Sequence, residues 1–145
     1  MTKVSFHILP TESQQDKYLF ACKMIEKAYR SGCFCYVMTD DDKQSQLIDD
    51  LLWTFRAGSF IPHQIYTGEL PELEKVILIG SLAPPENWQH TLFNLSARCP
   101  DPELKPQRIL EILDNSETTK AAGRDRYRQY QQSGMTVIKH KPLKA

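Results

Sequence analysis

Apolar and polar residues follow two different periods in the first part of the chain. Residues 3–8 alternate with a period of two, and residues 33–39 form an apolar run rich in aromatic and β-branched side chains, so both segments are predicted strands. Apolar residues recur at helical spacing over about 14–31, and a second helical pattern begins at residues 40–42 and is expected to end at Gly58. The order strand, helix, strand, helix is typical of a parallel α/β sheet.

The second half of the chain continues this pattern after a long connection. The predicted connection covers 56–74, the predicted strands cover 76–79, 91–96, 109–113 and 135–140, and the last helix covers 116–132. No linker or shift in composition divides the chain. We therefore expect a single α/β domain over residues 1–140, with residues 141–145 as a flexible C-terminal tail.

Composition narrows the class of protein. The chain has 145 residues, of which 41% are hydrophobic and 25% charged, as in a typical folded domain. No apolar run approaches the roughly 20 residues that span a bilayer, and the N-terminal segment lacks the apolar core of a secretory signal. The expected compartment is the cytoplasm, with no membrane contact. Lys plus Arg and Asp plus Glu number 18 each, which disfavours nonspecific binding to duplex DNA.

The charges are distributed unevenly despite this balance. Acidic residues concentrate at the second predicted helix, at Asp40, Asp41, Asp42, Asp49 and Asp50. Basic residues concentrate in the last quarter of the chain, at Lys120, Arg124, Arg126, Arg128, Lys139, Lys141 and Lys144. Any binding of an acidic partner is therefore expected at the C-terminal end of the chain.

The four cysteines do not have the spacing of a zinc site. Cys22, Cys33, Cys35 and Cys99 form no CxxC pair and have no accompanying histidine cluster. Cys33 and Cys35 lie two apart in a predicted strand, so both side chains are expected on one face. We interpret all four as buried, reduced thiols, with a metal site as the lesser alternative.

No nucleotide-binding motif follows the first strand. The turn after residue 8 contains no glycine, whereas a phosphate-binding loop and a dinucleotide fingerprint both need glycines there. The four histidines are scattered and no local signature of a hydrolytic site accompanies them. The α/β order alone therefore predicts neither a nucleotide cofactor nor a small-molecule substrate.

Three aspartates at the end of the second strand have two interpretations. Asp40, Asp41 and Asp42 cap the next helix in the first. In the second, Asp40 and Asp41 hold Mg²⁺ together with Asp114, because open α/β sheets bind ligands at the carboxyl ends of their strands. The second interpretation gives the alternative function of a metal-assisted phosphatase or nuclease.

Large aromatic side chains crowd the end of the second helix and the loop that follows. Trp53, Phe55, Phe60 and Ile61 lie close to Arg56, and this is the composition of an interface hot spot. The same residues are equally well explained as core. The residue types alone do not decide between these two interpretations.

The last predicted helix has a cationic face with one aromatic residue. Lys120, Arg124, Tyr127 and Arg128 fall within about 100° of one another on a helical wheel. Ala122, Gly123 and Tyr130 lie elsewhere on the wheel and are expected to face the sheet. The cationic face is suited to an acidic peptide with a free carboxylate, to single-stranded DNA, or simply to solvent.

The motifs around these two segments resemble the chi subunit of bacterial DNA polymerase III holoenzyme. The similar stretches are residues 28–32, 39–41, 51–53, 59–63 and 123–128, together with Phe6 and Gly134. The resemblance implies a Rossmann-like domain, with a mostly parallel sheet flanked by helices and without a nucleotide site. It also implies a non-catalytic accessory subunit with no cofactor or metal, whose contact with DNA is indirect.

The resemblance further implies two protein partners. The first is the psi subunit, bound one to one and linking chi to the clamp loader, and its surface here includes Trp53, Phe60, Pro62 and His63. The second is the acidic C-terminal tail of single-stranded DNA-binding protein, SSB. The site expected for that tail includes Leu113, Lys120, Arg124, Tyr127 and Arg128.

Overall fold

A computed structural model describes residues 2–33, 35–56, 58, 60–72 and 75–140. The strands are β1 (Lys3–Ile8), β2 (Cys35–Met38), β3 (His63–Ile65), β4 (Ile77–Gly80), β5 (Thr91–Asn94), β6 (Arg108–Leu113) and β7 (Thr136–His140). The helices are α1 (Gln14–Arg30), α2 (Asp42–Thr54) and α3 (Glu117–Gln132), with short 3₁₀ turns at Glu86–Trp88 and Pro102–Leu104.

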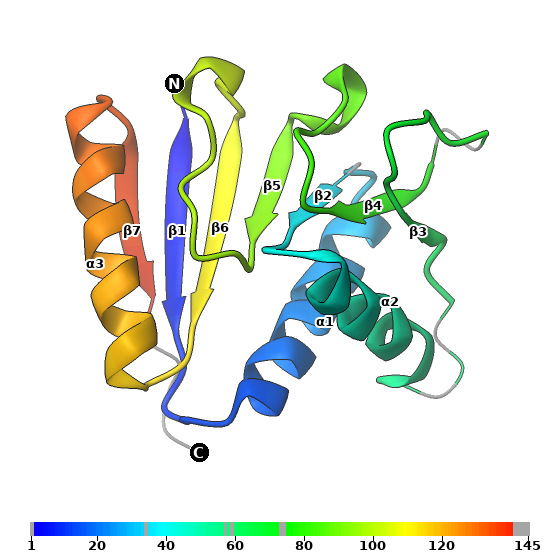
Figure 1. Ribbon diagram of the computed structural model, residues 1–145, viewed down its shortest axis with the longest axis horizontal. Coiled ribbons are helices and arrows are strands. Elements are labelled where there is room, and N and C mark those ends of the chain that lie inside the picture. The colour runs from blue at the N-terminus through cyan, green and yellow to red at the C-terminus, as the bar shows by residue number, and fades with distance from the viewer. Residues whose placement is uncertain (1, 34, 57, 59, 73–74, 141–145) are drawn as a thin grey trace.

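The seven strands form one parallel sheet in the order β3-β4-β2-β5-β6-β1-β7. Helices α1 and α2 cover one face of the sheet, and α3 covers the β6–β1–β7 part of the other face (Figure 1). The carboxyl ends of β5, β6, β1 and β7 lie toward the bottom of this view. The predicted α/β, Rossmann-like class is confirmed. The expected tail, residues 141–145, lies outside the described residues.

Each face of the sheet has its own apolar core. Ile25 of α1, Ile48 of α2 and Val37 of β2 belong to the core on the α1–α2 side. On the α3 side, Phe6 of β1 and Tyr130 of α3 pack with Trp88, whose indole nitrogen donates to the Val76 carbonyl at 2.8 Å. Central strands that are buried on both faces explain the continuous apolar runs in the sequence.

Polar side chains cap the N-termini of all three helices. The Ser13 hydroxyl accepts from the Asp16 amide at 3.2 Å, the Asp41 carboxylate from the Gln44 amide at 2.8 Å, and Ser116 from the Thr119 amide. Gly32 follows α1 with a φ of 89°, as expected for the residue after a helix. The predicted end of α2 at Gly58 is wrong, because the helix ends at Thr54 and the positive φ of Gly58 belongs to the following loop.

The segment predicted as a long connection contains an additional strand. β3 has three residues and pairs in parallel with β4 at the edge of the sheet, with His63 opposite Ile77. Such a short strand carries no readable alternation, and its hydrogen bonds come from a distant segment. The strand predicted at 33–39 is shorter than expected, and β5 ends at Asn94.

The cysteines are free thiols, as the sequence predicted. Cys22 and Cys35 are fully buried, and burial raises the pKa of each thiol to about 12. Cys33 and Cys99 are only half-buried, which corrects the expectation that all four are buried. Cys33 packs against the same core as Cys35, so the predicted common face is confirmed.

No helix among the described residues has both the length and the apolar character needed to cross a bilayer.

Candidate functional site

Helix α3 presents three residues to the sheet at helical spacing. Gly123, Arg126 and Tyr130 are buried, whereas Arg124 and Arg128 are exposed. The expectation that Gly123 and Tyr130 face the sheet is confirmed, whereas Ala122, which was also expected there, is only half-buried. Arg126 was counted among the basic residues of the last quarter of the chain, but its side chain is only 5% exposed, so its charge is not available at the surface.

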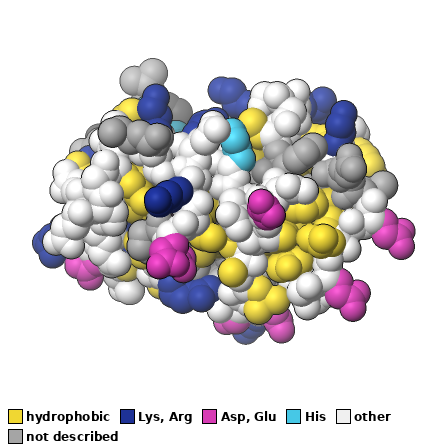
Figure 2. Space-filling model, turned by 90° about the horizontal axis from the view of Figure 1, so that it is seen from above, with side chains coloured by type: hydrophobic (Ala, Val, Ile, Leu, Met, Phe, Trp, Pro, Cys, Tyr) yellow, Lys and Arg dark blue, Asp and Glu magenta, His cyan; other side chains and the backbone are white. Residues whose placement is uncertain are grey.

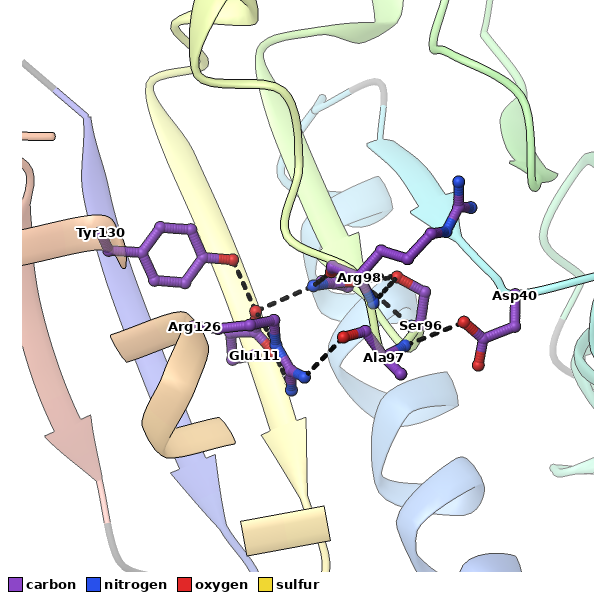
Figure 3. A network of polar contacts seen from close by, with 8 residues as sticks. Asp40, Ser96, Ala97, Arg98, Glu111, Arg126 and Tyr130 are labelled. Carbon is purple, nitrogen blue, oxygen red and sulfur yellow. Dashed lines mark hydrogen bonds and ion pairs between the residues drawn. The ribbon is translucent and has the colours of Figure 1, made fainter. Parts of the chain in front are cut away.

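A buried carboxylate on β6 explains the position of Arg126. The guanidinium donates from Nε to Glu111 Oε2 at 2.9 Å and from Nη2 to Oε1 at 3.0 Å. The Tyr130 hydroxyl and the Asn94 amide also donate to Oε2, at 2.5 and 2.9 Å (Figure 3). Burial raises the pKa of Glu111 above its usual value, while Arg126 and the two neutral donors act in the opposite direction.

The same network continues along the carboxyl ends of the strands. Arg126 Nη1 donates to the Ala97 carbonyl at 3.2 Å, and the Ala97 amide donates to Asp40 Oδ1 at 2.9 Å (Figure 3). Arg98 donates to the carbonyls of Thr39 and Ser81 at 3.0 and 3.2 Å. These contacts fix the loop after β5 against α3 on one side and against the start of α2 on the other.

Close packing of α3 against β6 depends on Gly123. A Cβ atom at this position would lie 2.5 Å from Cδ1 of Leu113. The absence of a side chain therefore lets Leu113 lie directly beneath the helix. This arrangement places an apolar side chain at the base of a pocket beside α3.

The pocket between α3, β1 and β7 has a volume of about 260 Å³. It is lined by Phe6, Ile8, Leu113, Lys120, Gly123, Arg124, Tyr127, Arg128 and Lys139. All five residues predicted for the SSB tail are in this set. The structure adds Phe6 and Ile8 from β1 and Lys139 from β7, which sequence reasoning missed because only the parallel pairing of these strands brings them beside α3.

Weak ion pairs hold three of the cations around this pocket. Lys120 and Arg124 lie 3.2 and 3.8 Å from Glu117, whose side chain is 82% exposed. Arg128 lies 3.5 Å from the exposed Asp125. Pairs this open to solvent contribute little and are easily exchanged for an incoming acid.

Tyr127 forms the aromatic wall of the pocket. Its ring centroid lies 5.5 Å from that of Phe6, and the Lys139 ammonium lies 4.8 Å from the Tyr127 centroid. Among the described residues, Lys139 has no carboxylate partner. The pocket thus combines an apolar floor with a cationic rim.

A separate aromatic surface lies at the end of α2. Trp53 and Phe60 are 52% and 67% exposed, with ring centroids 5.8 Å apart. For these two residues the core interpretation is therefore wrong, because both rings are largely on the surface. Phe55 is half-buried and Ile61 is buried at 2% exposure, so the core interpretation holds for that pair.

The other two residues predicted for this surface lie deeper. Pro62 is half-buried, and the His63 side chain is fully buried beneath Trp53, with ring centroids 4.6 Å apart. The two ring nitrogens of His63 lie 2.6 Å from the Ile61 carbonyl and 3.1 Å from the Asp49 carbonyl. His63 therefore supports Trp53 from below.

The three aspartates of the metal-site alternative do not converge. Asp41 caps α2, and Asp40 accepts the Ala97 amide. Asp114 lies 3.5 Å from Lys17 and accepts both the amide and the hydroxyl of Ser116. Within the described residues, no group of three or more His, Cys, Asp or Glu side chains is arranged to hold a metal ion.

Figure 2 shows the protein from the side at which β1, β5 and β6 begin. Positive and negative side chains are interspersed there, and hydrophobic side chains gather on the half of this face toward β4 and β3 (Figure 2).

Known proteins match this sequence over nearly its whole length. The family model described as "DNA polymerase III chi subunit, HolC" matches residues 1–138. DNA polymerase III subunit chi of Pseudomonas aeruginosa is 30% identical over 141 residues, covering 97% of each chain. The Haemophilus influenzae subunit is 27% identical, covering 91% of this chain and 92% of its own, and that of Escherichia coli is 23% identical, covering 94% and 96%. This chain therefore belongs to the DNA polymerase III chi subunit family, a non-catalytic accessory component of the replicase.

Proposed function

We propose that this chain bridges two proteins at the bacterial replication fork, in the cytoplasm. The α3 pocket holds the acidic C-terminal tail of SSB, and the aromatic surface of Trp53 and Phe60 holds the psi subunit of the clamp loader. Binding of the SSB tail is supported by the pocket itself, in which Leu113 and Tyr127 form an apolar slot bordered by cations. Binding of psi is supported by the two exposed aromatic rings.

The chemistry of the pocket matches a peptide that ends in an apolar residue. The terminal side chain enters between Tyr127 and Leu113, and Arg124 pairs with the free carboxylate. Lys120 and Arg128 meet acidic residues further along the tail. Glu117 gives up its contacts with Lys120 and Arg124 at little cost, because it is exposed to solvent.

The expected affinity is modest. Each charge-assisted contact contributes about 1.5–3 kcal/mol when partly desolvated. Ordering a flexible peptide offsets part of this, which leaves a dissociation constant in the micromolar range. SSB bound along a single strand displays many tails, so avidity strengthens the complex at the fork.

Titration of a fluorescent SSB-tail peptide tests the pocket. Arg124→Ala is expected to weaken binding at least about tenfold, because the carboxylate loses a charge-assisted partner. Lys43→Ala is the matched control, since Lys43 is an exposed cation on α2, away from the pocket. Equal affinity of the wild type and Arg124→Ala would show that the tail binds elsewhere.

Co-purification with psi tests the aromatic surface. Trp53→Ala and Phe60→Ala each remove an exposed ring, and loss of such an anchor typically costs 2 kcal/mol or more, or about a thirtyfold loss of affinity. Both variants are expected to keep their affinity for the SSB tail. Retention of psi by the double variant would remove this surface from the proposal.

A further inference from the structure

The strands that line the α3 pocket expose a second, cationic face on the opposite side of the sheet. Helix α1 packs on β2 and β6, while β1 and β7 continue beyond it to the edge of the sheet (Figure 1). The parallel register places Lys3, His7 and His140 on the α1 side, because Lys3 pairs with Arg108 and His7 with both Ile112 and His140. Ile112 belongs to the core beneath α1.

Helix α1 turns two further cations toward this area. Phe20, Lys23 and Lys27 fall within about 60° of one another on the helical wheel. The ring centroid of Phe20 lies 5.7 Å from that of His7, which fixes this flank of α1 beside β1. Asp16, at the start of the helix, is the acid on this flank, and its Oδ2 accepts the Thr11 hydroxyl.

We define the open sheet surface by these residues of α1 and the three strands. It consists of Lys3, His7, Lys23, Lys27, Arg108 and His140. Four of these residues are exposed cations: Lys23, Lys27, Lys3 and Arg108. Within the described residues, none of the four forms an ion pair. Four uncompensated charges in a protein of zero net charge make a local positive potential.

Two of the cations border a hollow of a size that suits an anion. A cavity of about 150 Å³ is lined by Met24, Lys27, Ala28, Ser31, Phe93, Arg108 and Leu110. Lys27 and Arg108 reach it from α1 and from the start of β6. Its other side chains are mostly apolar and carry no acid, so the cations meet no competing carboxylate there.

Flat rings lie beside the cations. The imidazoles of His7 and His140 are stacked, with centroids 4.8 Å apart and planes inclined by 12°. His140 is exposed, and its ring is therefore accessible to solvent. Cations that follow a backbone, together with open ring faces, are the two elements of single-strand binding without sequence preference.

We propose that the open sheet surface binds single-stranded DNA directly, through its phosphate backbone and through bases stacked near His140. This goes beyond the proposed function, which needs only the α3 pocket and the aromatic surface. An acidic peptide fits less well, because it would use the charges but leave the ring stack without a partner. β7 separates the two faces, with Lys139 on the pocket side and His140 on the open side. Single-stranded DNA would therefore lie on one face of the sheet, while the tails of the SSB bound to that DNA occupy the α3 pocket on the other face.

Fluorescence anisotropy with a labelled oligothymidylate tests this surface in the absence of SSB. Four phosphate contacts predict a log–log salt slope of about −2.8, or roughly a fiftyfold loss of affinity between 50 and 200 mM salt. The Lys23→Glu/Lys27→Glu variant is expected to lose at least about tenfold in affinity at low salt and to reduce the slope by about 1.4. Lys43→Glu/Lys75→Glu changes the net charge equally with exposed lysines elsewhere and is expected to bind within about twofold of the wild type.

Three further measurements make the outcome decisive. Binding of the SSB-tail peptide to Lys23→Glu/Lys27→Glu is expected to be normal, which shows that the variant is folded and separates this surface from the α3 pocket. A Lys120→Glu/Arg128→Glu variant is expected to keep its affinity for the oligonucleotide. A duplex or an acidic peptide is expected to compete poorly. The proposal is overturned if the wild type does not bind at low salt, if the control loses as much as the α1 variant, if only the α3 variant loses affinity, or if either competitor matches the oligonucleotide.

Discussion

Arg126 on α3 and Glu111 on β6 form a two-point ion pair inside the protein, with N···O distances of 2.9 and 3.0 Å. The pair fixes the rotation of α3 about its own axis, because Arg126 must point into the sheet. Tyr127 and Arg128, the next residues along the helix, are then directed to the pocket. A buried contact that binds no ligand thus decides which side chains the proposed SSB site presents.

Breaking this pair is expected to be strongly destabilising. Arg126→Met leaves the Glu111 carboxylate buried without its cation, which costs about 3–5 kcal/mol. For a chain of this length, chemical denaturation should show that loss, together with a fall in Tm of roughly 10 °C. Arg124→Met, an exposed position on the same helix, is expected to change stability by no more than about 0.5 kcal/mol.

The partner substitution makes the prediction specific. Glu111→Gln combined with Arg126→Met removes both charges, so the double variant is expected to be more stable than Arg126→Met alone. A double variant that loses the sum of the two single losses would mean that the charges act independently.

Much of the fold followed from the sequence because most elements are long or strongly patterned. The three helices have capping residues and apolar faces, and the central strands are continuous apolar runs. β3 was missed because three residues at an edge show no periodicity. The end of α2 was placed too late because Gly58 takes its positive φ in a loop and does not terminate the helix.

Only the part of the pocket that α3 contributes could be predicted from the sequence. The wheel placed Lys120, Arg124, Tyr127 and Arg128 together, whereas the contributions of β1 and β7 depend on long-range strand order. The burial of Arg126 had a signal that went unused. Glu111 interrupts an apolar strand and needs a buried partner, and Gly123, Arg126 and Tyr130 share the spacing of a sheet-facing stripe.

Gly123→Ala is expected to separate stability from binding. Alanine favours a helix interior by about 1 kcal/mol over glycine, but its Cβ would meet Leu113 Cδ1 at 2.5 Å. Leu113 must shift within the pocket, so stability is expected to change by less than about 1 kcal/mol while affinity for the SSB tail falls about tenfold. Denaturation and peptide titration on the same sample measure both. An unchanged affinity would mean that Leu113 does not line the slot that the tail uses.

His7 is expected to resist protonation in the folded protein. Burial lowers its pKa below 6.5, and the nearby His140 and Arg108 lower it further. The unfolded chain therefore binds this proton more readily, and the contribution of His7 to stability is present above pH 6.5 and is lost as the pH falls below it.

An NMR titration of the His7 ring measures this pKa directly. His140→Gln is expected to raise it toward 6.5, because one of the neighbouring charges is removed. His90→Gln removes a histidine elsewhere and is expected to leave the His7 pKa unchanged. If His140→Gln also leaves it unchanged, the stacked rings are not coupled in solution.

Lys139 is expected to contribute to SSB-tail binding although it lies on a strand at the edge of the sheet. Its ammonium lies 4.8 Å from the Tyr127 ring and, within the described chain, has no carboxylate partner. An incoming acid therefore meets this charge without displacing another. Because Lys139 is exposed, its contribution is small, about 1 kcal/mol, and Lys139→Met is expected to weaken the peptide about fivefold. Lys139→Arg keeps both the charge and the contact with the ring and is expected to bind like the wild type. Equal affinities for the Met and Arg variants would place the acidic part of the tail on the Lys120–Arg124 side of the pocket alone.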